Sequence, residues 1–217
     1  MTLRPHLIDP QQTMQIPIHQ VASADLPTRL GNFRILGFEL HRPDNCEARR
    51  ETGVALIMGD LTCNAPLLRI HSQCLTGDVF SSLRCDCGEQ LQASLGMIAR
   101  EGSGLLIYEE QEGRGIGLIP KVQAYELQDR GCDTVEANER LGYRSDQRDY
   151  FLPVQILHHL GIRRVRLITN NPEKIQSLTL AGIEVNERIP CETVPTAYGL
   201  RYLQTKKQKM GHLLSNI

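Results

Sequence analysis

The order of apolar and polar residues predicts strands in the first third of the chain and alternating strands and helices after it. Residues 32–40 (NFRILGFEL), 53–60 (GVALIMGD) and 65–70 (APLLRI) are short runs rich in branched residues, separated by polar or Gly and Pro stretches. Such runs are typical of successive strands. After Cys87 the period lengthens, because Leu91, Leu95 and Ile98 recur at helical spacing before Gly102.

The second half continues this alternation. Residues 104–110 (GLLIYEE) and 165–169 (VRLIT) predict buried strands, and Asn171-Pro172 is a helix start with a capping residue followed by proline. Helical patterns cover 118–131, 151–161 and the C-terminal stretch 202–214 (YLQTKKQKMGHLL). We therefore predict an α/β fold, with a mixed sheet, flanking helices, a β-rich N-terminal third and a single compact domain over residues 24–217. Residues 1–23 lack periodicity and are predicted to form a loosely ordered extension.

Composition narrows the choice of partner. The chain has 217 residues, of which 41% are hydrophobic and 23% charged, with a formal net charge of -1. This balance gives no bulk attraction to nucleic acid or to an anionic membrane, so we expect neither as a partner. Without an apolar run of spanning or signal-peptide length, cytoplasmic residence is the expectation.

Three of the seven cysteines are crowded together. Cys74, Cys85 and Cys87 lie in the stretch HSQCLTGDVFSSLRCDCGEQ, which favours a metal site over disulfides. Three thiolates suffice for a catalytic zinc, which keeps one coordination position for water. His71 could instead close a structural site, and inert buried thiols are a third reading. The scattered Cys46, Cys63, Cys132 and Cys191 are interpreted as small core residues.

A long ordered set of motifs gives a family resemblance. The segments 68–91 (LRIHSQCLTGDVFSSLRCDCGEQL), 111–150 (QEGRGIGL through YRSDQRDY) and 167–190 (LITNNPEKIQSLTLAGIEVNERIP) closely resemble GTP cyclohydrolase II. The resemblance implies hydrolysis of GTP to formate, pyrophosphate and a diaminopyrimidinone ribosylamino phosphate, the first step of riboflavin biosynthesis. It also implies one zinc ion per subunit, magnesium on the triphosphate, and a homodimer.

The resemblance also implies roles for single residues. Cys74, Cys85 and Cys87 would be the zinc ligands, and Tyr125 would lie beside the zinc-bound water. Asp146 and Arg148 would act as general base and in attack on the phosphate. Because arginine keeps its proton, a guanidinium clamp on the leaving pyrophosphate is the alternative to a nucleophile. Taken alone, Tyr125 could be packing, and Asp146 with Arg148 could be a surface ion pair that caps the next helix.

The nucleotide ligands implied by the resemblance combine cationic, hydroxyl and amide groups suited to a triphosphate. They are Arg69, Ile70, His71, Ser72, Gln73, Gln90, Glu112, Gly113, Arg114, Thr134, Thr169 and Lys174. Two departures stand out: Gln73 replaces the usual glutamate, and Glu109-Glu110 precedes QEGR. Carboxylates beside a triphosphate would weaken its binding unless they face away or hold magnesium.

Two rival functions follow from the same residues. One is a paralogue that retains the formamide or acts on a related purine, and the other is a non-catalytic nucleotide-binding protein with a structural zinc. Retention of Tyr125, Asp146 and Arg148 favours the complete cyclohydrolase over both.

Overall fold

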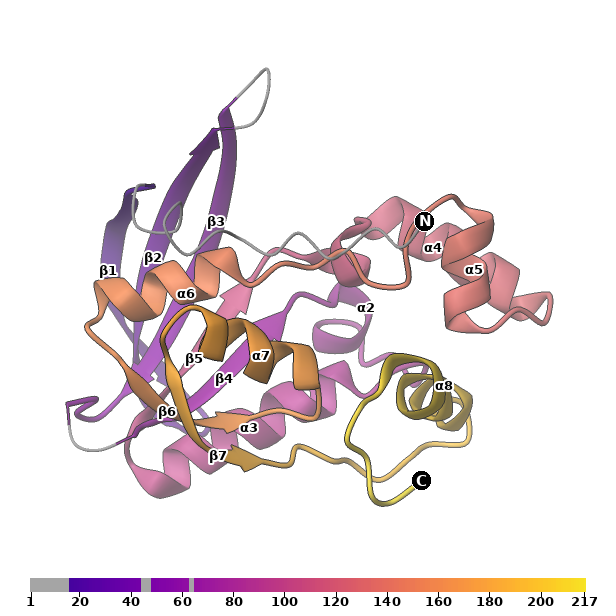
Figure 1. Cartoon of the computed structure of the whole chain (residues 1–217). Helices are drawn as coiled ribbons and strands as arrows, with labels where there is room; N and C mark the ends of the chain where they lie inside the picture. Colours follow the sequence, from indigo (N-terminus) through magenta and orange to yellow (C-terminus); the bar gives the residue numbers. More distant parts are fainter. Residues whose placement is uncertain (1–15, 44–47, 63–64) are drawn as a thin grey trace.

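The sheet is the framework that places every other element. The computed structural model describes residues 16–43, 48–62 and 65–217, and within them seven strands form one sheet with helices on both faces (Figure 1). Cys46, Cys63 and the first fifteen residues of the predicted extension lie outside the described residues. The predicted α/β fold, with its mixed sheet and β-rich N-terminal third, is confirmed.

The sheet has an antiparallel half and a parallel half. Its order is β1-β2-β3-β5-β4-β6-β7; β1, β2, β3 and β5 pair antiparallel, while β5, β4, β6 and β7 pair parallel. The strands are β1 (Ile18–Thr28), β2 (Gly31–Pro43), β3 (Ala48–Met58), β4 (Leu67–Ser72), β5 (Gly104–Glu109), β6 (Arg164–Ile168) and β7 (Glu184–Ile189). In the parallel half all carboxyl ends reach the same edge of the sheet, which is where ligands bind in α/β folds.

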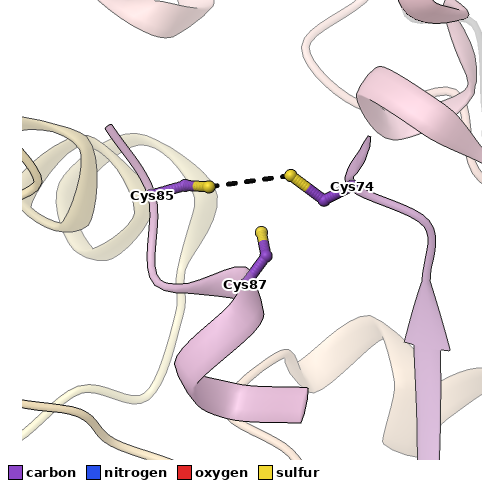
Figure 2. Close-up of side chains that lie close together, drawn as sticks. All are labelled: Cys74, Cys85 and Cys87. Atoms are coloured by element: carbon purple, nitrogen blue, oxygen red, sulfur yellow. Dashed lines mark hydrogen bonds between the residues drawn. The ribbon is translucent and has the colours of Figure 1, made fainter. Parts of the chain in front are cut away.

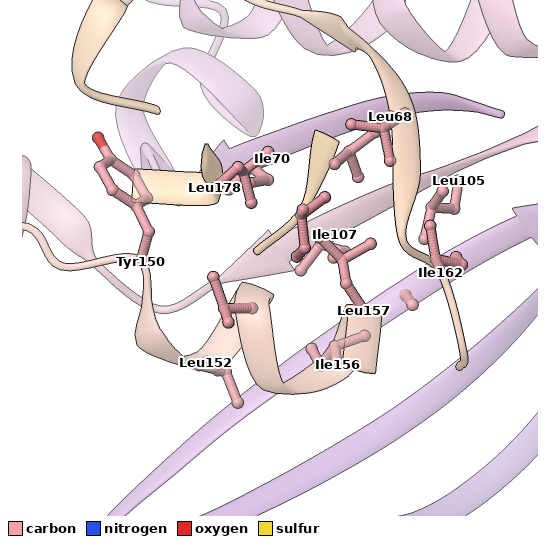
Figure 3. Packing of buried hydrophobic residues seen from close by; sticks show 14 of the residues in the cluster. Leu68, Ile70, Leu105, Ile107, Tyr150, Leu152, Ile156, Leu157, Ile162 and Leu178 are labelled. Carbon is pink, nitrogen blue, oxygen red and sulfur yellow. The ribbon is translucent and has the colours of Figure 1, made fainter. Parts of the chain in front are cut away.

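The helices cover both faces and extend beyond that edge (Figure 1). They are α2 (Leu75–Asp78), α3 (Cys87–Glu101), the 3₁₀ turn η1 (Glu112–Gly115), α4 (Leu118–Asp129), α5 (Thr134–Arg140), α6 (Phe151–His159), α7 (Pro172–Leu180) and α8 (Leu200–Met210). The larger core lies between the sheet and helices α6 and α7 (Figure 3). A smaller core lies on the other face, where Ile98 of α3 packs with Leu67 and Leu106.

Along β4, side chains alternate between the hydrophobic core and the face that carries candidate site residues. Leu68 and Ile70 belong to the core under α6 and α7 and are fully buried. Because successive side chains of a strand point to opposite faces, Arg69 and His71 point to the face of α3. The chain therefore keeps its apolar residues on one side of β4 and its polar site residues on the other.

Most predicted elements are confirmed, with differences at the ends of the chain. Strand β1 begins at Ile18, so residues 18–23 of the predicted extension are part of the sheet. Helix α8 ends at Met210 rather than continuing to Leu214, because Gly211 adopts a left-handed conformation with φ of 65°. Helix α5 and strand β7 were not predicted. No helix among the described residues is both long enough and apolar enough to cross a bilayer.

Candidate functional site

A cavity opens beyond the carboxyl ends of β4, β5 and β6. The segments at and after these strand ends line it: residues 72–74 at the end of β4, 112–114 after β5 and 169–174 after β6. Helices α4, α5 and α8 contribute to its other walls. Parallel strands thus bring together three stretches of sequence that are far apart along the chain.

The three clustered thiols meet in this cavity (Figure 2). Cys74 precedes α2, Cys87 is the first residue of α3, and Cys85 lies in the loop between these helices. Their sulfur atoms all lie within 4.8 Å of one another, and the Sγ atoms of Cys74 and Cys85 are 3.6 Å apart. Among the described residues, no other group of three or more His, Cys, Asp or Glu side chains converges in this way. Three sulfurs at this spacing form a donor set that suits zinc.

A glycine leaves the space that these thiols occupy. A Cβ atom added to Gly77 would lie 3.0 Å from the Sγ of Cys85, 3.1 Å from the Cβ of Cys87 and 3.2 Å from the Sγ of Cys74. A Cβ added to Gly88 would lie 2.3 Å from the carbonyl oxygen of Gly77. The two glycines therefore allow α2 and α3 to approach closely enough for their cysteines to share one ion.

A buried lysine contacts the thiol cluster. The Nζ of Lys121 on α4 lies 3.1 Å from the Sγ of Cys74 and donates to the Oε1 of Glu112 at 2.7 Å. Hydrogen bonding with Cys85 and Cys87, helped by Lys121, lowers the pKa of Cys74. For Cys85, the hydrogen bond with Cys74 acts in the other direction and raises its pKa to about 11. Burial opposes the charge of Lys121, but the Cys74 thiolate and Glu112 more than offset it, so the pKa of Lys121 is raised. Lys121 thus places a positive charge beside the Cys74 sulfur, whose lowered pKa favours the thiolate.

Glu112 ties this lysine to the backbone of the site. Its Oε2 accepts from the amide of Leu75 at 2.7 Å, and its Oε1 also accepts from the amide of Gly113 at 2.9 Å. Both carboxylate oxygens of Glu112 are therefore engaged within the protein. Its first role in the folded chain is to connect η1, α2 and α4.

Tyr125 lies one turn after Lys121 on the same helix, beside the thiols. Its hydroxyl is 3.1 Å from the Oγ1 of Thr76, which in turn is 3.6 Å from the Sγ of Cys74. The guanidinium of Arg84 lies over the ring, 4.9 Å from its centroid. Burial raises the pKa of Tyr125 to about 12, so the phenol keeps its proton and can donate it. Tyr125 therefore lines the same cavity as the three clustered thiols.

His71 does not join the three thiols, although the sequence left it open as a fourth ligand of a closed zinc site. Its Nε2 lies 3.1 Å from the Oδ1 of Asp78, its ring stacks on Tyr108, and its nitrogens are not part of the converging ligand set. Burial lowers the pKa of His71. Asp78 also accepts from the Cys74 amide at 3.0 Å, so this pair fixes the backbone of Cys74. Among the described residues the converging set is thus the three cysteines, and His71 is not part of it.

Positive charge concentrates on the remaining walls. Arg69 donates to the Oε1 of Gln90 at 2.6 Å, and the Lys174 ammonium donates to the carbonyl oxygen of Ile70 at 2.7 Å. Lys174 is only 4% exposed, which excludes a solvated surface charge. Burial and the nearby Arg69 and Arg148 lower the pKa of Lys174 well below its ordinary value. An anion entering the cavity would relieve this crowding of cations.

Asp146 and Arg148 form an ion pair at the edge of the cavity. The Nε of Arg148 donates to the Oδ1 of Asp146 at 3.0 Å, and both side chains are largely buried. Although burial opposes it, Arg148 holds the pKa of Asp146 below its ordinary value. The pair does not cap α6, because the carboxylate of Asp149 accepts from the Phe151 amide there. Arg148 lines the cavity, whereas Asp146 stands behind it.

Comparison with known proteins agrees with this geometry. A profile of the GTP cyclohydrolase II family matches residues 19–190. The GTP cyclohydrolase-2 of Azotobacter vinelandii is 52% identical over 198 residues, covering 91% of this chain and 92% of that protein. That of Buchnera aphidicola is 52% identical over 196 residues, covering 90% of this chain and 98% of that protein.

This chain belongs to the GTP cyclohydrolase II family.

GTP cyclohydrolase II activity in riboflavin biosynthesis follows as its function, with GTP as the substrate that the family implies. The chain spans about half of a longer relative, the riboflavin biosynthesis protein RibBA of Chlorobium phaeovibrioides: the two are 49% identical over 199 residues, which is 91% of this chain and 47% of that protein.

Nearly all of the site residues predicted from the sequence line the cavity. The exceptions are Ile70, whose side chain belongs to the core, and Asp146, which stands behind Arg148. The residues that do line it are Arg69, His71, Ser72, Gln73, Cys74, Cys85, Cys87, Gln90, Glu112, Gly113, Arg114, Tyr125, Thr134, Arg148, Thr169 and Lys174. The two acidic residues that depart from the family pattern, Glu109 and Glu110, do not line the cavity. Glu109 is fully buried, accepts from the hydroxyl of Ser72 at 2.7 Å and does not line the cavity, and Glu110 is exposed.

Several lining residues were not predicted. They are chiefly Lys121 and the residues of the C-terminal segment, Tyr202, Lys206 and His212. Lys121 lies four residues before Tyr125, so helical spacing could have placed it on the same face. The C-terminal residues reach the cavity only through the folding of the whole chain, which no local pattern reports.

Gly77→Ala should lose zinc while the fold is kept. The added methyl would press on all three cysteines, at the Sγ of Cys85, the Sγ of Cys74 and the Cβ of Cys87, whereas the methyl of Gly96→Ala on the same side of the sheet meets only the end of Arg100 at 3.4 Å. Zinc retained after competition with a chelator, with circular dichroism to check the fold, separates the two variants. Equal zinc retention in both would contradict the spatial argument.

Lys121→Met should weaken zinc binding about 10- to 100-fold, the usual effect of removing a group that supports a metal ligand. The reason is that its ammonium offsets the charge of the Cys74 thiolate. Lys207→Met, on the exposed face of α8, is the matched control. Chelator competition gives the affinities, and an unchanged value for Lys121→Met would show that this lysine only packs.

Proposed function

We propose that this GTP cyclohydrolase II holds zinc on Cys74, Cys85 and Cys87 and binds GTP across the adjoining cavity. The observation that carries the proposal is the juxtaposition, in one cavity, of a three-thiolate cluster and a wall of buried cations. The first is suited to activating water, and the second to holding a triphosphate. Guanine would then lie toward the thiols and the phosphates toward Arg148 and Lys174.

The donor set fits a catalytic zinc. Three sulfurs converge without a fourth ligand among the described residues, and Lys121 adds a compensating charge. When bound, such a zinc supplies a water whose pKa is lowered to about 7, the nucleophile needed to open the imidazole ring at carbon eight. Magnesium, as a hard cation, would accompany the triphosphate oxygens. Magnesium and the homodimer stay predictions.

Tyr125 is proposed to guide the second hydration, which releases formate. Its phenol keeps its proton because burial raises its pKa to about 12, and it reaches the thiol region through Thr76. A donor of this kind could orient or protonate the formyl intermediate. Its presence favours complete formate release over a paralogue that retains the formamide.

Arg148 is proposed to act on the phosphates as a clamp. Its guanidinium is fixed by Asp146 and borders the cavity, where it can stabilise charge on the leaving pyrophosphate. A positively charged guanidinium paired with a carboxylate is a poor nucleophile, so the clamp explains its position more simply. Asp146 then positions Arg148 and does not itself face the substrate.

Two variants should separate the two halves of the reaction. In Cys87→Ser, formate release should fall by a hundredfold or more while some pyrophosphate is still released, because the Arg148 clamp does not require the thiol cluster. In Arg148→Ala, both products should fall, since a nucleotide that is not anchored presents carbon eight poorly to the thiol end. Formate and pyrophosphate are measured separately on zinc-loaded protein with GTP.

Arg163→Ala, an exposed arginine outside the cavity, is the matched control and should behave as the unmodified chain. Normal formate release by Cys87→Ser would contradict the zinc assignment. Robust formate release by Arg148→Ala would contradict anchoring by the phosphates. Binding of GTP without either product, in the unmodified chain, would point instead to the non-catalytic nucleotide-binding protein.

A further inference from the structure

The C-terminal segment, residues 200–214, forms a wall of the cavity to which the reaction above assigns no role. Tyr202 and Lys206 of α8 and His212 after it all line the cavity. The Lys206 ammonium donates to the Oδ1 of Asp86 at 2.7 Å and lies over the ring of Tyr202, 4.5 Å from its centroid. Lys206 is therefore held in place. The other two polar side chains of this wall are Tyr202 and His212, and His212 is the one that can gain a proton near neutral pH.

The backbone on both sides of His212 is fixed. Gly211 ends α8 with a φ of 65°, and the amide of His212 donates to the carbonyl of Lys206 at 3.1 Å. The next amide, that of Leu213, donates to the carbonyl of Asn170 at 2.8 Å. The backbone around His212 is thereby held between the end of α8 and the segment that leads into α7.

The surroundings of this imidazole are positively charged. The Nδ1 of His212 is buried and has no hydrogen-bond partner among the described residues. The charges that act on it most strongly come from three elements: Lys206 of α8, Arg148 before α6 and Arg114 of η1. A hydrogen bond with the Met210 backbone opposes them, but burial, reinforced by these cations, lowers the pKa of His212 to about 3, so the ring is neutral when the cavity holds no anion.

We propose that His212 is a phosphate ligand of the GTP site, which takes up a proton from solvent when the triphosphate enters and donates a hydrogen bond to a phosphate oxygen. The negative charge of the triphosphate reverses the field that keeps the ring neutral. A histidine carries out this change near neutral pH more readily than any other side chain. The inference rests on the proposed placement of the phosphates beside Arg148.

Proton uptake distinguishes this role from simple packing. The probe is a GTP analogue with a methylene group between its α and β phosphates, added with magnesium to the zinc-loaded protein at pH 7. Calorimetric titration in two buffers of different ionisation enthalpy measures both affinity and the number of protons taken up. His212→Gln should bind the analogue about 10- to 100-fold more weakly, because a charged hydrogen bond is lost. It should also take up fewer protons than the unmodified chain, by a difference of up to about one per site.

Two controls make the result specific. His19→Gln, an exposed histidine on β1, should match the unmodified chain in both measurements. Guanosine, which lacks phosphates, should bind equally to the unmodified chain and to His212→Gln. Equal proton uptake by the unmodified chain and His212→Gln would overturn the proposal, as would guanosine binding weakened as much as binding of the analogue.

Formate release from GTP by the unmodified chain, measured in parallel, separates this inference from the proposed function. If formate is released and His212→Gln takes up as many protons as the unmodified chain, only the role of His212 is wrong. If no formate is released, the proposed function itself fails.

Discussion

Three thiolate sulfurs within 4.8 Å of one another can coexist only if positive charge compensates them, and the site is arranged around this constraint. Lys121 provides one charge inside the protein, and zinc would provide the rest. Glu112 holds Lys121 in place and also binds the amides of Leu75 and Gly113. The charge balance of the metal site is thus built into the contacts that join η1, α2 and α4. Gly77 supplies the space without which the sulfurs could not converge.

Other residues that line the same cavity have the reverse imbalance. Arg69, Arg148 and Lys174 are buried close together, and the pKa of Lys174 is lowered well below its ordinary value by burial and by its cationic neighbours. Such crowding costs free energy in the empty protein and is relieved by a polyanion. Glu109 moderates it from behind the wall, where burial raises its own pKa to about 7. An acidic residue that looked unfavourable in the sequence therefore does not line the cavity.

What could be predicted from the sequence followed from local patterns. Spacing in the cysteine motif indicated a metal site. Periodicity placed α3, β5 and β6, because each repeats apolar residues on a face that packs into a core. Strand β7 escaped prediction because it is polar and largely exposed, and α5 because it is only 7 residues long. Lys121 and His212 are functional candidates only through tertiary contacts: one approaches Cys74 from another helix, and the other arrives from the C-terminal end of the chain.

The central claim is that zinc is held by three thiolates with a position left for water. X-ray absorption spectroscopy of the zinc-loaded protein tests it most directly, because zinc–sulfur distances of about 2.3 Å and zinc–oxygen distances of about 2.0 to 2.2 Å are well separated. We expect three sulfurs and one oxygen, with no imidazole signature. A fourth sulfur, or an imidazole such as that of His71 in the first coordination sphere, would contradict the claim and indicate a closed, structural site.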